Sequence, residues 1–426
     1  MVTKTRKEQM TVAELLALRG DRSVYVWGAA IVGMGITRTL ERIGSPPAAF
    51  LDKSPRFQNT TVMGYPVEHP DTLLGRSDLK EKVFLIVASG HYEDEIAGIC
   101  GAAGLKPGED FISARELSPL DPSIDISGMC NLRCISCPQG NLRENSLPRG
   151  FMSTARYEAA LGKLLDEVPL LGSVQICCWG EPLLNPDAAA IIETTVRRKV
   201  LCAVSTNLNI RRDFSGVVAA RPDWFRVSVS GYGASYERTH TGGDWELLYG
   251  NLHKLKEYKE KFHPGMYVEV DYHLYRHNRS DEYRAMTELC DKLDFAFRPA
   301  WAYLYPLDNV KAYCEGEPLS EEAEHTLALL QLGIDEGLAR ARRQAHLPCP
   351  EERCFPITWD MKVRSCGTYF IPTIEENFLA TPLREILERR DRSGICDECR
   401  RLGLHRYTAV YVEEPLPARL DPPQEK

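Results

Sequence analysis

The sequence predicts an α/β protein with an open parallel sheet at its centre, a smaller α/β unit before it and a small cysteine-rich unit after it. Strand-like and helix-like patterns alternate with little interruption between residues 120 and 345, which is typical of repeated β-strand–α-helix units. About six such units fit into this stretch, which is too few to close a barrel of eight strands. The first 118 residues repeat the alternation on a smaller scale, whereas residues 346–412 gather five of the fourteen cysteines. We therefore expect a partial (β/α)6 barrel between two smaller domains.

The composition is typical of a globular protein, since 43% of the 426 residues are apolar and 26% are charged. The formal net charge of −8 gives no basic footprint, so we expect no nucleic-acid partner. The basic start, "MVTKTRKEQM", is not followed by an apolar signal-peptide core, and the longest apolar run, Val83–Ser89, is too short to cross a membrane. We therefore expect a cytoplasmic protein with no membrane partner. In a reducing compartment, fourteen cysteines indicate metal binding or catalysis rather than disulfides.

Residues 1–118 form the first predicted domain, a small Rossmann-like α/β unit. Strands are expected at Ser23–Gly28, Ala48–Ser54 and Lys82–Ser89. A helix is expected after the first of these strands and another after the third.

The turn after the first strand carries Gly28, Ala30 and Gly33 at the spacing of a dinucleotide-binding fingerprint, and Asp52 ends the next strand. Such glycines permit a tight turn, while the following helix N-terminus attracts phosphate. Gly28, Gly33 and Asp52 are therefore candidate nucleotide- or nucleotide-sugar-binding residues. The alternative is a packing or docking role, because Ala30 would crowd a pyrophosphate and the unit is about half the size of a full dinucleotide domain. The same two features disfavour an NAD-dependent oxidoreductase.

The second predicted domain spans residues 119–345. It begins with a linker at Pro119–Ser123 and ends with one long helix at Ser320–Ala345. Between them the sequence predicts strands at 123–127, 173–182, 201–208, 224–233, 267–275 and 296–304, alternating with helices at 151–168, 185–199, 244–262 and 280–293.

Residues 346–412 form the third predicted domain, with one hairpin at Ile357–Cys366 and little other regular structure. A segment with so small an apolar core usually needs a metal to fold. We expect residues 413–426 to be a disordered tail.

Three cysteines, Cys130, Cys134 and Cys137, lie within eight residues directly after a predicted strand. Their number is odd, and their spacing is too tight for unstrained disulfides. Soft thiolates in such a loop select an iron–sulfur cluster or zinc. A cubane cluster has four irons, so a loop with three ligands leaves one iron open to another group.

The cysteine loop and three later motifs resemble those of the radical S-adenosylmethionine (radical SAM) enzymes, over about residues 120–310. "WGEP" at Trp179–Pro182 resembles the Gly-Gly-Glu-Pro motif of the family, with Trp179 in place of its first glycine. "STN" at Ser205–Asn207 resembles its Thr-Asn-Gly. "RVSVSG" at Arg226–Gly231 ends the strand on which related enzymes place polar contacts to SAM.

The resemblance implies a 4Fe-4S cluster on Cys130, Cys134 and Cys137, with SAM bound to the open iron. The cluster would pass one electron to SAM, giving methionine and a 5′-deoxyadenosyl radical that abstracts hydrogen from a substrate. An electron donor such as flavodoxin or ferredoxin is implied as a partner, and no catalytic hydrogen donor is singled out. Glu181 would receive the amino group of SAM. The SAM-binding residues that the resemblance implies are Gly180, Glu181, Pro182, Ser205, Asn207, Ser228 and Ser230.

The C-terminal cysteines resemble those of the auxiliary-cluster domains called SPASM and Twitch, in which a glycine-turned hairpin ends in cysteine. Here Met361 occupies the turn position. The resemblance implies one Twitch-like 4Fe-4S cluster, because five cysteines are too few for two fully ligated clusters. Zinc is the alternative, since four thiolates suit it equally well. The ligands implied are Cys349, Cys366, Cys396 and Cys399, with Cys354 as an alternative to Cys349.

The remaining cysteines lie singly or in a pair within apolar surroundings, and we expect small buried hydrophobes there. They are Cys100, Cys177, Cys178, Cys202, Cys290 and Cys314.

Three functions stay open. The first is a radical SAM enzyme acting on a small polar substrate, with a sugar or nucleotide-sugar as the leading candidate; an auxiliary cluster favours oxidation, and epimerisation or dehydration are alternatives. The second is a radical SAM enzyme that modifies a ribosomally made peptide, which usually carries a peptide-docking module. The third is a non-catalytic iron–sulfur or zinc scaffold or sensor, against which Gly180-Glu181-Pro182 argues, because a structural cluster needs no carboxylate for SAM.

Overall fold

The structure is a computed structural model, and it confirms an α/β protein with parallel-strand sheets. The predicted tail at 413–426 lies outside the described residues. The structure describes residues 10–55, 57–89, 92–118, 120–141, 149–370, 372–410 and 412.

The chain forms two compact units, and their boundaries differ from those of the three predicted domains. The cysteine-rich C-terminal segment belongs to the same unit as the preceding helices. The first unit comprises Met1–Pro122, Ala155–Gln175 and Ile191–Ala203, and the second comprises Ser123–Thr154, Ile176–Ala190 and Val204–Lys426.

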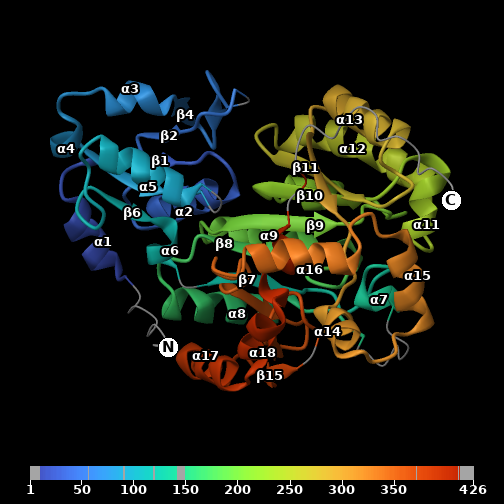
Figure 1. Cartoon of the computed structure of the whole chain (residues 1–426). Helices are drawn as coiled ribbons and strands as arrows, with labels where there is room; N and C mark the ends of the chain where they lie inside the picture. The colour runs from blue at the N-terminus through green and yellow to red at the C-terminus, as the bar shows by residue number, and fades with distance from the viewer. Residues whose placement is uncertain are drawn as a thin grey trace. The chain divides into compact units, whose positions relative to one another are not determined.

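The first sheet has six strands in the order β3-β4-β2-β1-β5-β6 (Figure 1). Strand β1 pairs in parallel with both β2 and β5, so later strands are added on both sides of it. The strands are β1 (Ser23–Trp27), β2 (Ala49–Leu51), β3 (Thr61–Val62), β4 (Tyr65–Glu68), β5 (Val83–Val87) and β6 (Phe111–Ser113). The helices are α1 (Val12–Arg19), α2 (Ile31–Arg42), α3 (Pro70–Leu74), α4 (Leu79–Lys82), α5 (Glu93–Ala102) and α6 (Ala114–Leu117).

Apolar side chains on both faces of this sheet explain its strands. Along β1, Val24 and Val26 belong to one buried group, whereas Tyr25 and Trp27 belong to another. Every residue of β5 is buried. Strands that are buried on both faces read as continuous apolar runs, and for this reason the sequence located β1 and β5 correctly.

The second sheet has nine strands in the order β12-β11-β10-β9-β8-β7-β13-β14-β15. The pairs β10–β11 and β11–β12 are parallel. The six expected strands are present in chain order, and their closure into a partial barrel stays a prediction. The strands are β7 (Asp121–Ile124), β8 (Ser173–Ile176), β9 (Leu201–Thr206), β10 (Trp224–Val229), β11 (Tyr267–Leu274), β12 (Ala296–Trp301), β13 (Cys354–Ile357), β14 (Val363–Arg364) and β15 (Thr373–Glu375).

The other helices connect or follow these strands, and in Figure 1 α12 and α13 lie over β10 and β11. Tyr283 of α13 meets Tyr272 and Phe297 edge-on, with ring centroids 6.1 and 5.0 Å away. The α-helices are α7 (Pro138–Asn141), α8 (Thr154–Glu167), α9 (Ala188–Arg197), α10 (Ser215–Ala219), α11 (Tyr236–Thr239), α12 (Trp245–Phe262), α13 (Asp281–Leu293), α14 (Leu307–Glu315), α15 (Glu321–Leu329), α16 (Ile334–Arg343), α17 (Leu383–Arg392) and α18 (Ile395–Leu402). The 3-10 helices are η1 (Pro182–Leu184), η2 (Gly233–Ser235) and η3 (Leu404–Ala409).

The predicted linker at Pro119–Ser123 is wrong in its second half, because Asp121 already begins β7. Ser123 and Ile124 are buried, and β7 lies between β8 and β13. Just after β7, Asp125 N donates to Ile357 O (2.8 Å). Pairing on both sides thus turns a proline-containing segment into a strand.

The single long helix predicted at Ser320–Ala345 is also wrong, because the structure has two helices, α15 and α16. Between them Leu330 is fully buried and forms an isolated β-bridge with Tyr275. Gly333 then provides the N-cap of α16. The tertiary pairing of Leu330 overrides a continuous helical pattern.

The C-terminal segment contains more regular structure than expected. The predicted hairpin is present as β13 and β14, and its turn residue Met361 has φ of +71°, the conformation that glycine adopts most readily. Strand β15 and helices α17 and α18 were not predicted. Tyr369, Leu404 and Tyr407 share a buried core with Leu338 of α16, so the apolar core is larger than the sequence suggested.

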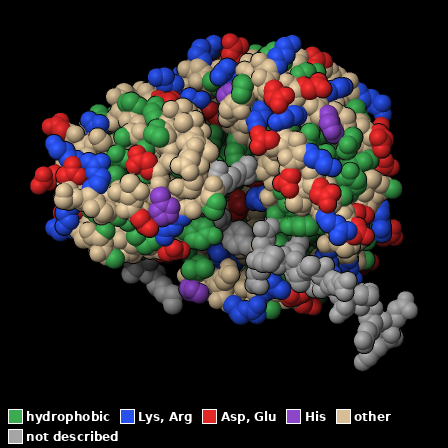
Figure 2. Space-filling view, turned by 90° about the horizontal axis from the view of Figure 1, so that it is seen from above, with side chains coloured by type: hydrophobic (Ala, Val, Ile, Leu, Met, Phe, Trp, Pro, Cys, Tyr) green, Lys and Arg blue, Asp and Glu red, His purple; other side chains and the backbone are tan. Residues whose placement is uncertain are grey.

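Surface charge is mixed on the face drawn in Figure 2, where basic and acidic side chains are interspersed among the described residues. No helix in the described part of the chain combines the length and apolar character needed to span a membrane.

Candidate metal centre

The cysteine loop begins a few residues after β7 and is held by its main chain. Arg133 N donates to Thr241 O, 2.9 Å away, on the segment that precedes α12. Cys137 N donates to Cys134 O (3.1 Å) and closes a turn that leads into α7. Backbone contacts therefore fix the shape of the loop.

The three thiols of the loop are free and partly buried. Burial raises the pKa of Cys130 to about 12 and that of Cys137 to about 11. Burial, followed by the charges of Cys137 and Cys130, raises the pKa of Cys134 well above its usual range. Thiols in such a setting need a bound cation to be held as thiolates, and a metal cluster provides it.

Thiolates suit both zinc and an iron–sulfur cluster. In a cubane cluster each thiolate binds a different iron, so a loop with three ligands leaves one iron open. The choice of an iron–sulfur cluster for this loop stays a prediction.

The loop that contains Gly180 is held against the end of β7. A Cβ atom at Gly180 would lie 1.7 Å from Ser127 O and 3.0 Å from Asp125 Oδ1, so only glycine fits there. Asp125 accepts hydrogen bonds from the backbone N–H groups of Trp179 (3.0 Å) and Gly180 (3.2 Å). Burial raises the pKa of Asp125 to about 6. Sequence reasoning missed Asp125, although an acid within the apolar run "SIDIS" was a signal.

Trp179, which replaces the first glycine of the expected motif, leaves one donor available. Its indole N–H is buried and has no hydrogen-bond partner among the described residues. An unsatisfied buried donor costs free energy unless a bound group accepts from it. The predicted cofactor loop thus has a hydrogen bond to offer.

Glu181 is only 2% exposed, and its carboxylate accepts three hydrogen bonds from the protein. Oε1 accepts from Thr206 Oγ1 (2.6 Å) and Leu183 N (2.9 Å), and Oε2 accepts from Asn207 N (2.8 Å). Burial raises the pKa of Glu181 to about 7, against the effect of these bonds. Glu181 therefore ties its own loop to the end of β9, and contact with an amino group would use its remaining acceptor capacity. Pro182 begins η1 and is buried.

Asn207, predicted to bind SAM, lies beside the cysteine loop. Its Nδ2 is 3.6 Å from Cys130 Sγ and 3.1 Å from Asn131 Oδ1. Ser205, two residues earlier on β9, bonds through its hydroxyl to the thiol of Cys177. Asn207 therefore contacts Cys130 directly, whereas Ser205 is bonded to Cys177.

Ser228 and Ser230 lie at the carboxyl end of β10. Ser230 is buried, and its Oγ is 3.1 Å from Nδ1 of His240. Burial lowers the pKa of His240 to about 3, so this imidazole is neutral. Ser228 is half-buried and pairs in register with Asp271 of β11.

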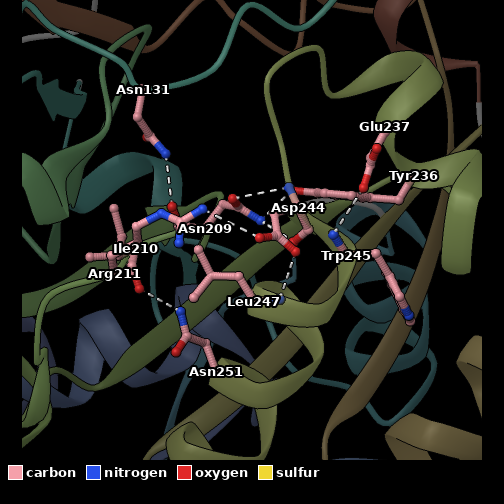
Figure 3. A network of polar contacts seen from close by, with 10 residues as sticks. All are labelled: Asn131, Asn209, Ile210, Arg211, Tyr236, Glu237, Asp244, Trp245, Leu247 and Asn251. Atoms are coloured by element: carbon pink, nitrogen blue, oxygen red, sulfur yellow. Dashed lines mark hydrogen bonds and ion pairs between the residues drawn. The ribbon is translucent and has the colours of Figure 1, made fainter.

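A polar network behind the cysteine loop was not predicted (Figure 3). Asn131 Nδ2 donates to Asn209 O (2.8 Å). The side chain of Asn209 donates to Asp244 O (2.7 Å) and Tyr236 OH (3.4 Å) and accepts from Asp244 N (3.2 Å). Asp244 in turn caps α12 through Leu247 N (3.1 Å). The network joins the cysteine loop to the start of a long helix.

We expect Asn209→Ala to lower the free energy of unfolding by about 2–3 kcal/mol, because it leaves the buried partners of Asn209 unsatisfied. Urea unfolding monitored by circular dichroism measures the effect, and iron analysis should show poorer retention. Asn309→Ala is the matched control: it removes one contact, to Tyr305 O at 3.3 Å, and should cost about 1 kcal/mol. Equal effects of the two changes would contradict a special role of the network.

Tyr275, at the end of β11, holds the cysteine loop from another side and was also missed. Its hydroxyl lies 2.7 Å from Ser136 Oγ, between two of the cysteines in sequence. Thr326 of α15 donates to Ile135 O (2.8 Å). Both contacts come from residues far away in the sequence, which no local pattern reveals.

The C-terminal thiols predicted as ligands lie near one another. Cys396 and Cys399 are one turn apart on α18, and Cys366 follows β14. After burial, the charge of Cys366 raises the pKa of Cys349, and the charges of Cys366 and Cys396 raise that of Cys399. Cys366 thus lies near both Cys349 and Cys399, and the binding of one cluster by the four cysteines stays a prediction.

Cys354, the alternative ligand, has different surroundings. Its thiol is hydrogen-bonded to Glu351, and the charge of Cys178 contributes to raising its pKa, after burial and the charges of Glu351 and Cys366. Its Sγ also lies 2.7 Å from where a Cβ atom at Gly367 would be.

The cysteines expected as buried hydrophobes divide into two groups. Cys100, Cys202 and Cys290 are buried as expected. The expectation is wrong for the half-buried Cys177, Cys178 and Cys314.

In the first unit, the glycines of the fingerprint serve close packing. A Cβ atom at Gly33 would lie 1.8 Å from Gly28 O, and one at Gly28 would lie 2.7 Å from Ala88 O. Asp52 Oδ2 accepts from Ala29 N (2.9 Å), which places the acid in the same turn. Nucleotide binding by Gly28, Gly33 and Asp52 stays a prediction.

Comparison of the sequence with family models and with curated proteins gives no match. Comparison of the fold gives several solved structures. SuiB of Streptococcus suis bound to precursor peptide SuiA has a TM-score of 0.45 and 13% identity, and the match covers 63% of this chain and 64% of SuiB, under two thirds of its length. BtrN in complex with AdoMet and 2-DOIA has a TM-score of 0.36 and 14% identity over 64% of this chain and 84% of BtrN.

A third structure, native anSMEcpe with bound AdoMet, has a TM-score of 0.43 and 15% identity over 64% of this chain and 82% of that one. These neighbours are radical SAM enzymes, the class that the motifs of this chain resemble.

Proposed function

We propose that this chain is a radical SAM enzyme in which Cys130, Cys134 and Cys137 hold a 4Fe-4S cluster with one iron open to SAM. When bound, the cluster supplies the electron that cleaves SAM reductively. The proposal depends on one observation. Three free thiols lie on a loop fixed by its backbone, close in the fold to Gly180, a position that has no room for a Cβ atom.

Residues around the thiols have separate tasks in this proposal. Asn207 donates toward Cys130 Sγ. Hydrogen bonds to the sulfur atoms tune the reduction potential of a cluster. Asp125 and Glu181 hold the loop at Gly180, whose backbone, with the indole N–H of Trp179, would be available to SAM. Ser205, Ser228 and Ser230 are proposed for the other polar groups of SAM, and Ser230 would have to share its hydroxyl with His240.

We also propose one auxiliary 4Fe-4S cluster on Cys349, Cys366, Cys396 and Cys399. Four protein ligands leave no iron for a substrate, so its task is electron transfer. This favours a net oxidation of a small polar substrate. An external one-electron donor such as flavodoxin or ferredoxin would reduce the protein in the cytoplasm.

The ligand set of the auxiliary cluster can be tested by comparing two neighbouring cysteines. Cys349→Ser should remove about four irons per chain. Cys354→Ser should keep about eight, because the Cys354 thiol is hydrogen-bonded to Glu351 and is not expected to be a ligand. Iron and sulfide analysis of anaerobically reconstituted protein measures both. If Cys354→Ser loses iron and Cys349→Ser does not, Cys354 is the fourth ligand in place of Cys349.

The proposed function itself is tested by reconstituting the wild-type protein, reducing it with dithionite and adding SAM. Release of 5′-deoxyadenosine, together with about eight irons per chain, is the expected result. A protein that binds iron and releases no 5′-deoxyadenosine at any reductant concentration would be a scaffold or sensor.

A further inference from the structure

Three neighbouring strands of the second sheet carry charged side chains on one face. In register, Arg226 of β10 is opposite Glu269 of β11, and Asp271 of β11 is opposite Arg298 of β12. The residues between them point to the face that α13 covers, as Tyr272 does. Buried parallel strands are normally apolar on both faces, so a charged face calls for an explanation.

The charged side chains neutralise one another. Glu269 Oε1 lies 3.1 Å from Nε of Arg226 and 3.1 Å from Nε of Arg298. Asp271 Oδ2 lies 2.8 Å from Nη2 of Arg298. Two guanidinium groups and two carboxylates leave no net charge, so neither an anion nor a cation finds an unbalanced counter-charge here.

One atom of the group has no partner. Asp271 is 7% exposed, and its Oδ1 makes no hydrogen bond within the described part of the chain. A buried acceptor in this state costs free energy that a donor from a ligand would recover. Arg298 is accessible, with 46% of its side chain exposed, and its guanidinium has donors left beyond those that Glu269 and Asp271 use.

His273 adds a neutral polar group to the same face. Its Nε2 lies 4.0 Å from Asp271 Oδ2, and burial lowers the pKa of the imidazole. A neutral imidazole has one N–H donor, one acceptor nitrogen and no charge.

We propose that Asp271 and Arg298 recognise a hydroxyl group on a neutral, polyhydroxylated substrate such as a sugar ring. One hydroxyl donates to Oδ1 of Asp271 and accepts from the guanidinium of Arg298, which a single hydroxyl oxygen can do because it is both donor and acceptor. A peptide backbone would need two groups for this, an N–H to donate and a carbonyl to accept. This inference rests on the proposed function, and it names the substrate class for that site.

The test measures binding of three sugars with the same ring and different charge: D-glucose (neutral), D-glucosamine (cationic) and D-glucuronate (anionic), with tetraglycine as a peptide probe. Calorimetry uses the reconstituted holoenzyme with SAM. Glucose should bind about tenfold or more tighter than either charged sugar. Asp271→Asn should weaken glucose binding by about tenfold or more, the size expected for a hydrogen bond to a charged acceptor.

Two further variants keep the test decisive. Asp281→Asn, at a carboxylate with 87% of its side chain exposed, is the matched control and should bind glucose like the wild type. If Asp271→Asn does not fold, Arg298→Gln takes its place and should show the same loss. Equal or tighter binding of a charged sugar, binding of tetraglycine alone, or no glucose binding by the wild type would each overturn the inference.

Release of 5′-deoxyadenosine without any sugar is measured on the same preparations. Release without selective glucose binding overturns the inference alone, whereas absence of release from the wild type overturns the proposed function.

Discussion

Replacement of Cys134 by alanine is expected to abolish release of 5′-deoxyadenosine and to lower the iron content from about eight to about four atoms per chain. The physical reason is that a loop with only three ligands cannot lose one and still hold a cluster. Cys134 lies at the centre of the loop, where its pKa is raised by the charges of both neighbouring thiols as well as by burial. The C-terminal thiols are untouched, so their visible absorbance should persist.

Cys314→Ala is the control for this change, since Cys314 is a half-buried thiol on α14 outside both groups of ligands. It should keep both the iron and the release of 5′-deoxyadenosine. The proposal is wrong if Cys134→Ala retains full release, because the loop would then not hold the reacting cluster.

Replacement of Gly180 by alanine is expected to lower the free energy of unfolding by about 3 kcal/mol. The new Cβ atom would lie 1.7 Å from Ser127 O, a backbone atom that cannot rotate away. The loop would have to leave Asp125, and with it the backbone contacts that face the cysteines. Urea unfolding under anaerobic conditions measures the loss, and 5′-deoxyadenosine release should fall with it.

Gly250→Ala provides the opposite result in the same protein. Gly250 lies within α12, and a Cβ atom there meets nothing within 4 Å. Alanine favours a helix interior over glycine by about 0.5–1 kcal/mol, so the protein should become more stable. A tolerated Gly180→Ala would show that the loop moves freely, contrary to its contacts.

The strands were the most predictable part of the fold. The apolar runs of β1, β5 and β9 come from burial on both faces, which is visible in a short stretch of sequence. The break between α15 and α16 was not visible, because it depends on pairing of Leu330 with Tyr275, a distant residue. Helix α17 has a detectable pattern, since Leu383, Ile386, Leu387 and Arg390 recur at helical spacing and are buried, although it lies between cysteines that predict a metal-stabilised segment.

The candidate site was predictable where a motif carries it. Cys130, Cys134 and Cys137 share one loop, and the structure brings Asn207 to that loop and Gly180 to the segment just before it. Its supports were not predictable to the same degree. Asn209 and Tyr275 contact the cysteine loop from 78 and 139 positions away, which no local spacing encodes. Glu181 accepts two of its bonds from Thr206 and Asn207, 25 and 26 positions away, whereas the bond from Leu183 N is local.

The place of β13 beside β7 has a consequence for how the protein is made. Strand β7 emerges from the ribosome early, but Ile357 O, which accepts from Asp125 N, is synthesised only after five further strands of the same sheet. Until then one edge of the nascent sheet has no neighbour and can pair with another chain. Release of truncated chains that end before β13 would therefore yield aggregates rather than a smaller working enzyme.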